Sequence, residues 1–145
     1  MVLPGVQALF GFQLVAVFSA PFFERLGRSE HVLHLGALVL TAVAVAMLMA
    51  PAAYHRQAEP DVVSEEFVAY ASTLLTGSML PLMLGLSIDV YVITTAMFHS
   101  AGTSLAVASV VLVTCGTLWF VIPGARRLRG RERAHTRRTR RLPAS

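Results

Sequence analysis

The sequence predicts an all-α integral membrane protein, a bundle of four antiparallel transmembrane helices with both termini in the cytoplasm. Hydrophobic residues make up 55% of the 145 residues and charged residues only 14%, whereas a soluble domain carries about 25% charged residues. Four apolar runs are each long enough to cross a hydrocarbon core of about 30 Å. We expect residues 1–125 to form the transmembrane domain, with spans at about 2–23, 32–54, 67–98 and 104–122.

The first two runs both have the features of retained spans. Pro4 suits the first turn of a helix, and the run 2–23 has no basic segment before it and exceeds the length of a signal-peptide core. The run 32–54 carries small residues at four-residue spacing, at Ala42, Ala46 and Ala50. This spacing indicates either a surface on which a second helix packs closely or simple alanine richness.

The third run, 67–98, has Asp89 as its one formally charged residue. As a helix it would be about 48 Å long, so it must tilt, kink at Pro81 or lie partly in the membrane interface. In the fourth run Trp119 stands near the end, as aromatic-belt residues do, and we expect Pro123 and Gly124 to stop the helix.

Arginine is distributed unevenly between the two sides of this arrangement. The side that holds residues 57–66 and the C-terminal tail has Arg56 and nine tail arginines, and the other side has Arg25 and Arg28. By the positive-inside rule the tail side is cytoplasmic. Residues 126–145 are too polar to build a core, and we expect a disordered tail there.

Asp89 is the leading candidate for chemistry, because a carboxyl inside a bilayer usually faces protein or water. Polar residues near the middle of the other spans could join it, and the set of candidates for ion or proton coupling is Asp89, Gln13, Thr41 and Ser109. A carboxyl that exchanges a proton within the membrane is the minimal part of a proton-coupled transporter. Two structural alternatives remain: a protonated Asp89 that joins helices through Gln13 or a backbone carbonyl, and an Asp89 near the outer headgroups beside Tyr91.

The histidines His31, His34 and His99 share the outer side, where they could in principle hold a metal or a haem. Neither an H-E-x-x-H nor a C-x-x-C-H motif accompanies them, so we expect interface histidines, no metal and no cofactor. On the inner side, basic residues are expected to contact anionic lipid headgroups, namely Arg56, Arg126, Arg127 and Arg129. The tail lacks the aromatic residues or fold of a nucleic-acid binder.

Two segments carry a resemblance to a known family. Pro4-Gly5-Val6-Gln7-Ala8-Leu9-Phe10-Gly11-Phe12-Gln13-Leu14, followed by Phe22-Phe23, is the first, and Ala50-Pro51-Ala52-Ala53-Tyr54-His55-Arg56 is the second. The chain resembles a family of small four-helix bacterial integral membrane proteins of unknown function, some members of which are automatically labelled sodium:proton antiporter. The resemblance implies one compact four-span unit in the bacterial cytoplasmic membrane. The chain departs from the family's pattern in lacking a charged segment before Pro4 and in its longer arginine tail.

No catalytic motif is present, so we expect a protein that is not an enzyme. The leading hypothesis is a non-catalytic accessory or structural membrane subunit, working as a homo-oligomer or beside a larger membrane partner. The alternative is a proton- or cation-coupled transporter that uses Asp89.

Overall fold

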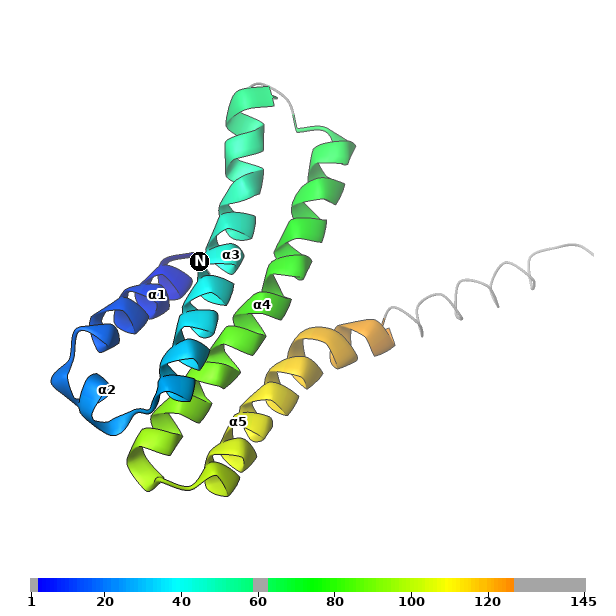
Figure 1. The fold of residues 1–145 in the computed structure, drawn as a ribbon. Coiled ribbons are helices and arrows are strands. Elements are labelled where there is room, and N and C mark those ends of the chain that lie inside the picture. The colour runs from blue at the N-terminus through cyan, green and yellow to red at the C-terminus, as the bar shows by residue number, and fades with distance from the viewer. Residues whose placement is uncertain (1–2, 59–62, 127–145) are drawn as a thin grey trace, which may run out of the picture. The chain divides into compact units, whose positions relative to one another are not determined.

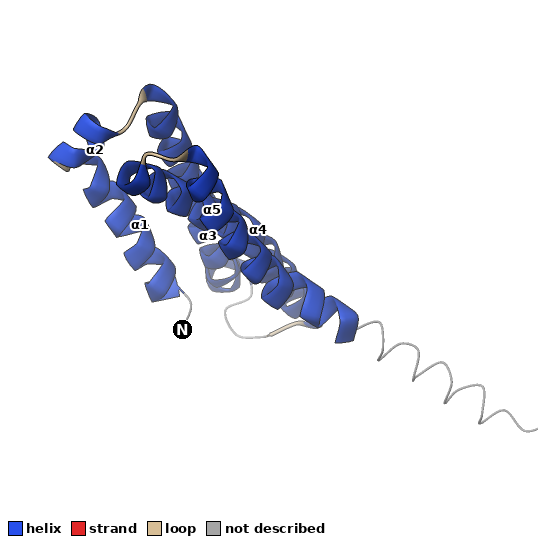
Figure 2. Cartoon of the chain, turned by 90° about the horizontal axis from the view of Figure 1, so that it is seen from below, coloured by secondary structure: helices blue, strands red, loops and turns tan. Residues whose placement is uncertain are grey.

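The computed structural model of the chain describes residues 3–58 and 63–126, and all the regular structure in this part is helical (Figures 1 and 2). The elements are α1 (Leu3–Val17), α2 (Ala20–Arg25), α3 (Arg28–Ala58), α4 (Glu65–Phe98), α5 (Ala101–Gly116) and the π-helical segment η1 (Thr117–Val121). The chain divides into two compact units, residues 1–112 and 113–145. The first unit contains α1 to α4 and most of α5, and it holds the site described below.

The all-α class is confirmed in the described residues. Three helices are long and apolar enough to cross a membrane: α3, α4 and the continuous helix Ala101–Arg126. Helix α1 is equally apolar but has only 15 residues. At 1.5 Å per residue it is about 22 Å long, short of a perpendicular crossing.

The expected single span 2–23 is interrupted, because α1 ends at Val17 and α2 begins at Ala20. Between them Ser19 is extended, and its hydroxyl donates to the carbonyl of Ala16 at 2.7 Å. Pro21 follows in the first turn of α2. Proline has no N–H to continue the preceding ladder, but it fits the start of a new helix. The run therefore forms two helices with a turn between them.

Helices α3 and α4 form the main packing interface of the first unit, and they lie side by side in Figure 1. The buried residues of α3 follow a heptad-like spacing and are His34, Ala37, Thr41, Ala44 and Pro51. On α4, a Cβ atom added to Gly85 would lie 3.1 Å from both the carbonyl of Ala37 and the hydroxyl of Thr41. The two helices therefore approach closely because small residues face each other at this point.

The stripe at Ala42, Ala46 and Ala50 is not the buried face of α3 within this chain. Ala46 is exposed, and Ala42 and Ala50 are only partly buried. Ala37, Thr41 and Ala44, by contrast, have no exposed surface. The spacing of four was right for a helix, but alanines recur on several faces of α3, so spacing alone could not select the one that packs.

The ends of α3 and α4 next to residues 59–62 are joined by aromatic contacts. The Tyr54 ring stacks on Phe67 with centroids 6.1 Å apart, and it also contacts Tyr70 at 5.1 Å. Helix α4 begins at a capped turn, in which Ser64 Oγ accepts the Phe67 N–H at 3.0 Å. Two acidic residues in the first turn favour the same helix end electrostatically.

The expected stop at Pro123 and Gly124 is wrong, because the helix continues through both residues to Arg126. The π-helical segment η1 lies immediately before Pro123, and Ile122 N–H bonds to the carbonyl of Thr117. Wider turns of this kind accommodate local disruptions of the α-helical ladder.

Candidate functional site

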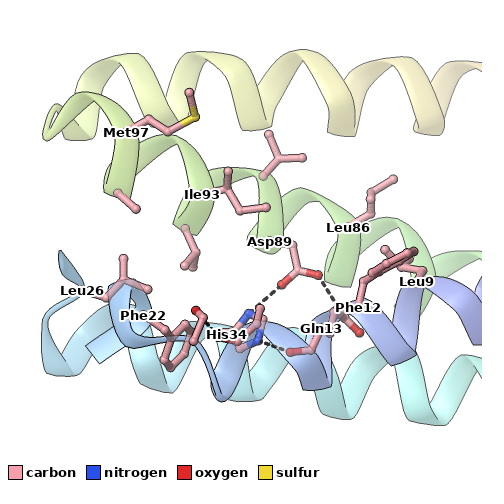
Figure 3. A pocket seen from close by; sticks show the side chains of 15 residues that line it. Leu9, Phe12, Gln13, Phe22, Leu26, His34, Leu86, Asp89, Ile93 and Met97 are labelled. Carbon is pink, nitrogen blue, oxygen red and sulfur yellow. Dashed lines mark hydrogen bonds and ion pairs between the residues drawn. The ribbon is translucent and has the colours of Figure 1, made fainter. Parts of the chain in front are cut away.

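Asp89 is buried in the first unit, where side chains from α1 and α3 reach it (Figure 3). Gln13 Nε2 donates to Asp89 Oδ2 and also to Thr41 Oγ1, the latter at 3.2 Å. The Thr41 hydroxyl in turn donates to the Ala37 carbonyl at 3.0 Å. Asp89 is 5% exposed, Gln13 4% and Thr41 0%. The structure therefore brings together three of the four polar residues that the sequence suggested.

His34, which was assigned from the sequence only to the outer interface, completes this cluster. Its Nδ1 lies 3.0 Å from Asp89 Oδ1, and its Nε2 lies 3.1 Å from the backbone carbonyl of Gln13. The side chain is buried between the helices. We refer to Asp89, His34, Gln13 and Thr41 as the polar cluster.

The other two histidines lie apart from the cluster's hydrogen bonds. His31 Nε2 is 3.1 Å from the Phe22 carbonyl, and its ring packs against the Phe22 ring with centroids 4.7 Å apart. His99 is exposed and ends α4 in the left-handed conformation, with its N–H bonded to the Thr95 carbonyl at 2.9 Å. His31 thus fixes α2 on α3, and His99 serves as a helix cap.

The contacts of His34 determine how many protons the Asp89–His34 pair holds. A backbone carbonyl only accepts hydrogen bonds, so the bond to Gln13 O requires a proton on His34 Nε2. The contact between Nδ1 and Asp89 Oδ1 then needs one further proton. This proton belongs either to an imidazolium facing a carboxylate or to a carboxylic acid facing a neutral imidazole. Both arrangements are neutral overall, and they differ only in where one shared proton sits.

Removing the shared proton leaves two acceptors facing each other. With Nε2–H kept, the Nδ1 lone pair would face the Asp89 carboxylate. With the proton moved to Nδ1, the Nε2 lone pair would face the carbonyl of Gln13. Either arrangement forfeits a buried hydrogen bond, at a cost of about 1–3 kcal/mol. The hydrogen bonds of the pair are therefore complete only when it holds one shared proton.

Gln13 has no hydrogen left to donate, because its side-chain amide gives one bond to Asp89 and one to Thr41. Its Oε1 atom is buried without a hydrogen-bond partner in the described part of the chain. In the described part of the chain, the Gln13 side chain is therefore held only by the hydrogen bonds that its NH₂ group donates. One of its N–H groups is directed at Asp89 Oδ2, in the carboxylate that would carry the negative charge when the shared proton leaves, and the other at the Thr41 hydroxyl.

A pocket of about 360 Å³ adjoins the polar cluster. Its polar lining residues are Gln13, Ser19, His34 and Asp89, and most of the remaining lining is apolar. Figure 3 shows Leu9 and Phe12 toward one end of this space and Leu26 and Met97 toward the other. Asp89 therefore borders an open volume as well as its protein partners.

The polar cluster lies nearer to one end of the helix pair than to the other. Asp89 precedes Phe98, the last residue of α4, by nine positions, and His34 follows the first residue of α3 by six. These intervals correspond to about 14 Å and 9 Å of helix. The cluster is therefore on the side of the turn at 99–100, away from residues 59–62.

The remaining candidate residues are elsewhere. Ser109 is exposed on α5 and does not line the pocket. Arg56 and Arg126 are exposed at helix ends, and Arg127 and Arg129 lie outside the described residues. Within residues 3–58 and 63–126, no group of three or more His, Cys, Asp or Glu side chains is arranged to hold a metal ion.

The place of His34 in the polar cluster could have been predicted from the sequence. His34 precedes Thr41 by seven residues, with Ala37 between them, so all three share one face of a helix. Thr41 is a candidate from its depth in the span, and the helix face that it shares with His34 indicates His34 as a further candidate.

Together, these features show that the described residues are helical in their regular structure, with three helices of membrane-spanning length and a buried carboxyl–imidazole–amide cluster beside a pocket. The chain belongs to the family of unknown function DUF6328, which matches residues 1–123. No curated protein and no solved structure matches it. The predicted membership of a family of unknown function is therefore confirmed, and the match ends just before the arginine tail.

Proposed function

We propose that the protein is a small multi-pass membrane transporter, not an enzyme, that exchanges a proton at the Asp89–His34 pair for a second cation. One observation supports this most strongly. A carboxyl in a helix of membrane-spanning length is bonded to an imidazole and an amide and also borders a pocket. Ionisable residues at membrane depth usually mark ion or proton pathways.

Exchange follows from the balance of charge at the pair. With its shared proton the pair is neutral, and without it the site carries one uncompensated negative charge. An uncompensated charge within a bilayer raises the free energy of the protein. The release of one cation from the site should therefore coincide with the binding of the other. Alternating exposure of the filled site to the two sides would then couple the two movements.

The proposed topology is an antiparallel bundle with residues 57–66 and the C-terminus in the cytoplasm. The arginine distribution supports this orientation, since Arg56 and the nine tail arginines share one side. The polar cluster then lies in the outer half of the membrane. The basic residues would contact anionic lipids at the inner leaflet, which we take to be that of the bacterial cytoplasmic membrane.

Proton movement in reconstituted vesicles tests the transport proposal. Vesicles holding a pH-sensitive dye are given an outward proton gradient, and sodium, potassium or an organic cation is then added outside. We expect cation-driven proton release in wild type, loss of that signal in Asp89→Asn and no change in Ser109→Ala. If none of the cations drives proton flux, or if Asp89→Asn retains the flux, the proposal fails.

The accessory-subunit hypothesis keeps one observation in its favour. In α5 only Ser104 and Ala108 are buried among the described residues, so most of this helix could face lipid, a second copy or a larger partner. Native mass measurement in mild detergent separates these cases. A monomer without a partner would speak against an accessory role, and a stable complex that conducts no protons would favour it over transport.

A further inference from the structure

We infer that the second cation is an apolar organic cation, a protonated amine or a quaternary onium ion, bound in the pocket against Asp89. This inference deepens the proposed exchange function and depends on its proton site. It rests on the pocket's lining, its single carboxyl and its aromatic side chains.

The lining of the pocket suits an organic group better than a bare metal cation. A hard inorganic cation needs several oxygen ligands to replace its hydration shell. Here the Ser19 hydroxyl is already engaged with Ala16. The remaining side-chain oxygens of the lining are Gln13 Oε1 and the two Asp89 oxygens, which are fewer than a hard cation needs. Leucine, isoleucine and phenylalanine side chains make up much of the remaining wall.

The volume of the pocket agrees with this class of ligand. About 360 Å³ is within the range of small-molecule sites, which are typically about 300–1,000 Å³ and mostly apolar with a few polar groups. An onium ion that carries hydrocarbon groups would fill such a space. It would also replace lost hydration with apolar contacts.

The charges around the pocket favour a cation. Of its described lining residues, Asp89 and His34 are the titratable ones, the former on α4 and the latter on α3. Helix α1 contributes the neutral Gln13 amide. When the shared proton is released to water, Asp89 is negatively charged and His34 is neutral. A bound organic cation then restores neutrality, so the cation and the proton compete for one site.

Two aromatic rings add to the attraction. Phe12 and Phe22 both line the pocket, and the Phe22 ring also lies edge-on against His34, with centroids 5.1 Å apart. A cation over a phenyl face gains a further electrostatic contribution. Phe18 provides a matched control for Phe12, because both are largely exposed but Phe18 does not line this pocket.

The test uses purified full-length protein in detergent and methyltriphenylphosphonium, which carries a permanent charge and no titratable proton. Binding is measured by equilibrium dialysis against protein-free micelles, with neutral triphenylphosphine oxide as the matched ligand. Proton release is followed in weakly buffered solution. We expect saturable binding of the cation but not of the oxide, with release of up to about one proton per bound cation by linkage.

Four single-residue variants test where the phosphonium ion binds. Asp89→Asn should abolish both saturable binding and proton release. Phe12→Leu and Phe22→Leu should each weaken binding by about threefold to tenfold, while Phe18→Leu leaves it unchanged. If Phe22→Leu disturbs folding through its contact with His34, Phe12→Leu carries the aromatic test alone.

The outcomes separate this inference from the transport proposal. Proton exchange driven only by sodium or potassium, with no saturable phosphonium binding, overturns the organic-cation inference and leaves the transporter standing. Asp89-dependent phosphonium binding with proton release, but without flux in vesicles, supports the ligand class and overturns transport. Equal binding of the charged and neutral ligands, or binding that survives Asp89→Asn, contradicts the inference directly.

Discussion

Asp89 Oδ1 on α4 lies 3.0 Å from His34 Nδ1 on α3, and this contact joins residues 55 positions apart in the chain. Since His34 Nε2 faces the Gln13 carbonyl at 3.1 Å, the contact requires a shared proton. A single contact between two helices thus provides both a structural link and a candidate proton site.

Removing both partners of this pair should cost less than the sum of the costs of removing each alone. We expect His34→Leu or Asp89→Leu alone to lower the free energy of unfolding by about 1–3 kcal/mol, because each leaves a buried polar group without its partner. The double variant should cost less than the sum of the two, with a coupling energy of about 0.5–3 kcal/mol. Thermal unfolding in detergent measures this cycle, and strict additivity would argue against the contact.

A methyl group at Gly85 should disturb the α3–α4 interface. Its Cβ would lie 3.1 Å from the Ala37 carbonyl and from Thr41 Oγ1, and a backbone atom cannot easily move away. We expect Gly85→Ala to destabilise the protein by about 1–3 kcal/mol. Gly36→Ala is the control, because its Cβ meets nothing within 4 Å. Equal unfolding temperatures for the two variants would contradict the close approach.

The polar residues should rank by the number of side-chain hydrogen bonds that each makes within the polar cluster. Gln13→Leu should reduce proton flux and stability strongly, because the amide donates both to Asp89 and to Thr41. Thr41→Val should have a smaller effect, because Thr41 only accepts from Gln13 and donates to the backbone. Ser109→Ala should match wild type. Vesicle flux together with unfolding temperature measures the order, and a Ser109 effect as large as that of Gln13 would contradict it.

The membrane sides can be mapped with a cell-impermeant thiol reagent. Cys115 is first changed to Ala, and single cysteines are then placed at Ser64 and at Ser145. We expect no labelling of either position in intact cells and labelling of both after lysis, because both should face the cytoplasm. A cysteine at Ser29, in the first turn of α3, is the positive control for the outer side. Labelling of Ser145→Cys in intact cells would reverse the proposed orientation.

The helix class and the presence of three helices long and apolar enough to cross a membrane could be read from the sequence, because long apolar runs with few charges have few other solutions. The break at Ser19 could not be placed as easily. Pro21 is compatible both with the end of one helix and with the start of the next, and only the extended Ser19 decides between them. Pro123 shows the converse, since a proline expected to stop the helix lies within it.

Part of the polar cluster could also be predicted from the sequence. Asp89, Gln13 and Thr41 stood out because polar groups are rare in apolar runs, and the structure places them together. Ser109 met the same criterion but faces outward, since depth along a helix does not determine which way a side chain points. His34 was assigned to the interface because the predicted topology places it on the outer side with His31 and His99, without a metal or haem motif. Its face on the helix, shared with Ala37 and Thr41, was the better guide.

Infrared difference spectroscopy tests most directly whether the Asp89–His34 pair holds a transferable proton. Purified protein in lipid is stepped between acidic and alkaline buffer, and the carboxyl and imidazole bands are recorded for wild type, Asp89→Asn and Ser109→Ala. We expect wild type and Ser109→Ala to show one reversible protonation change with coupled carboxyl and imidazole bands, and Asp89→Asn to lack it. An identical difference spectrum in Asp89→Asn would contradict the central claim.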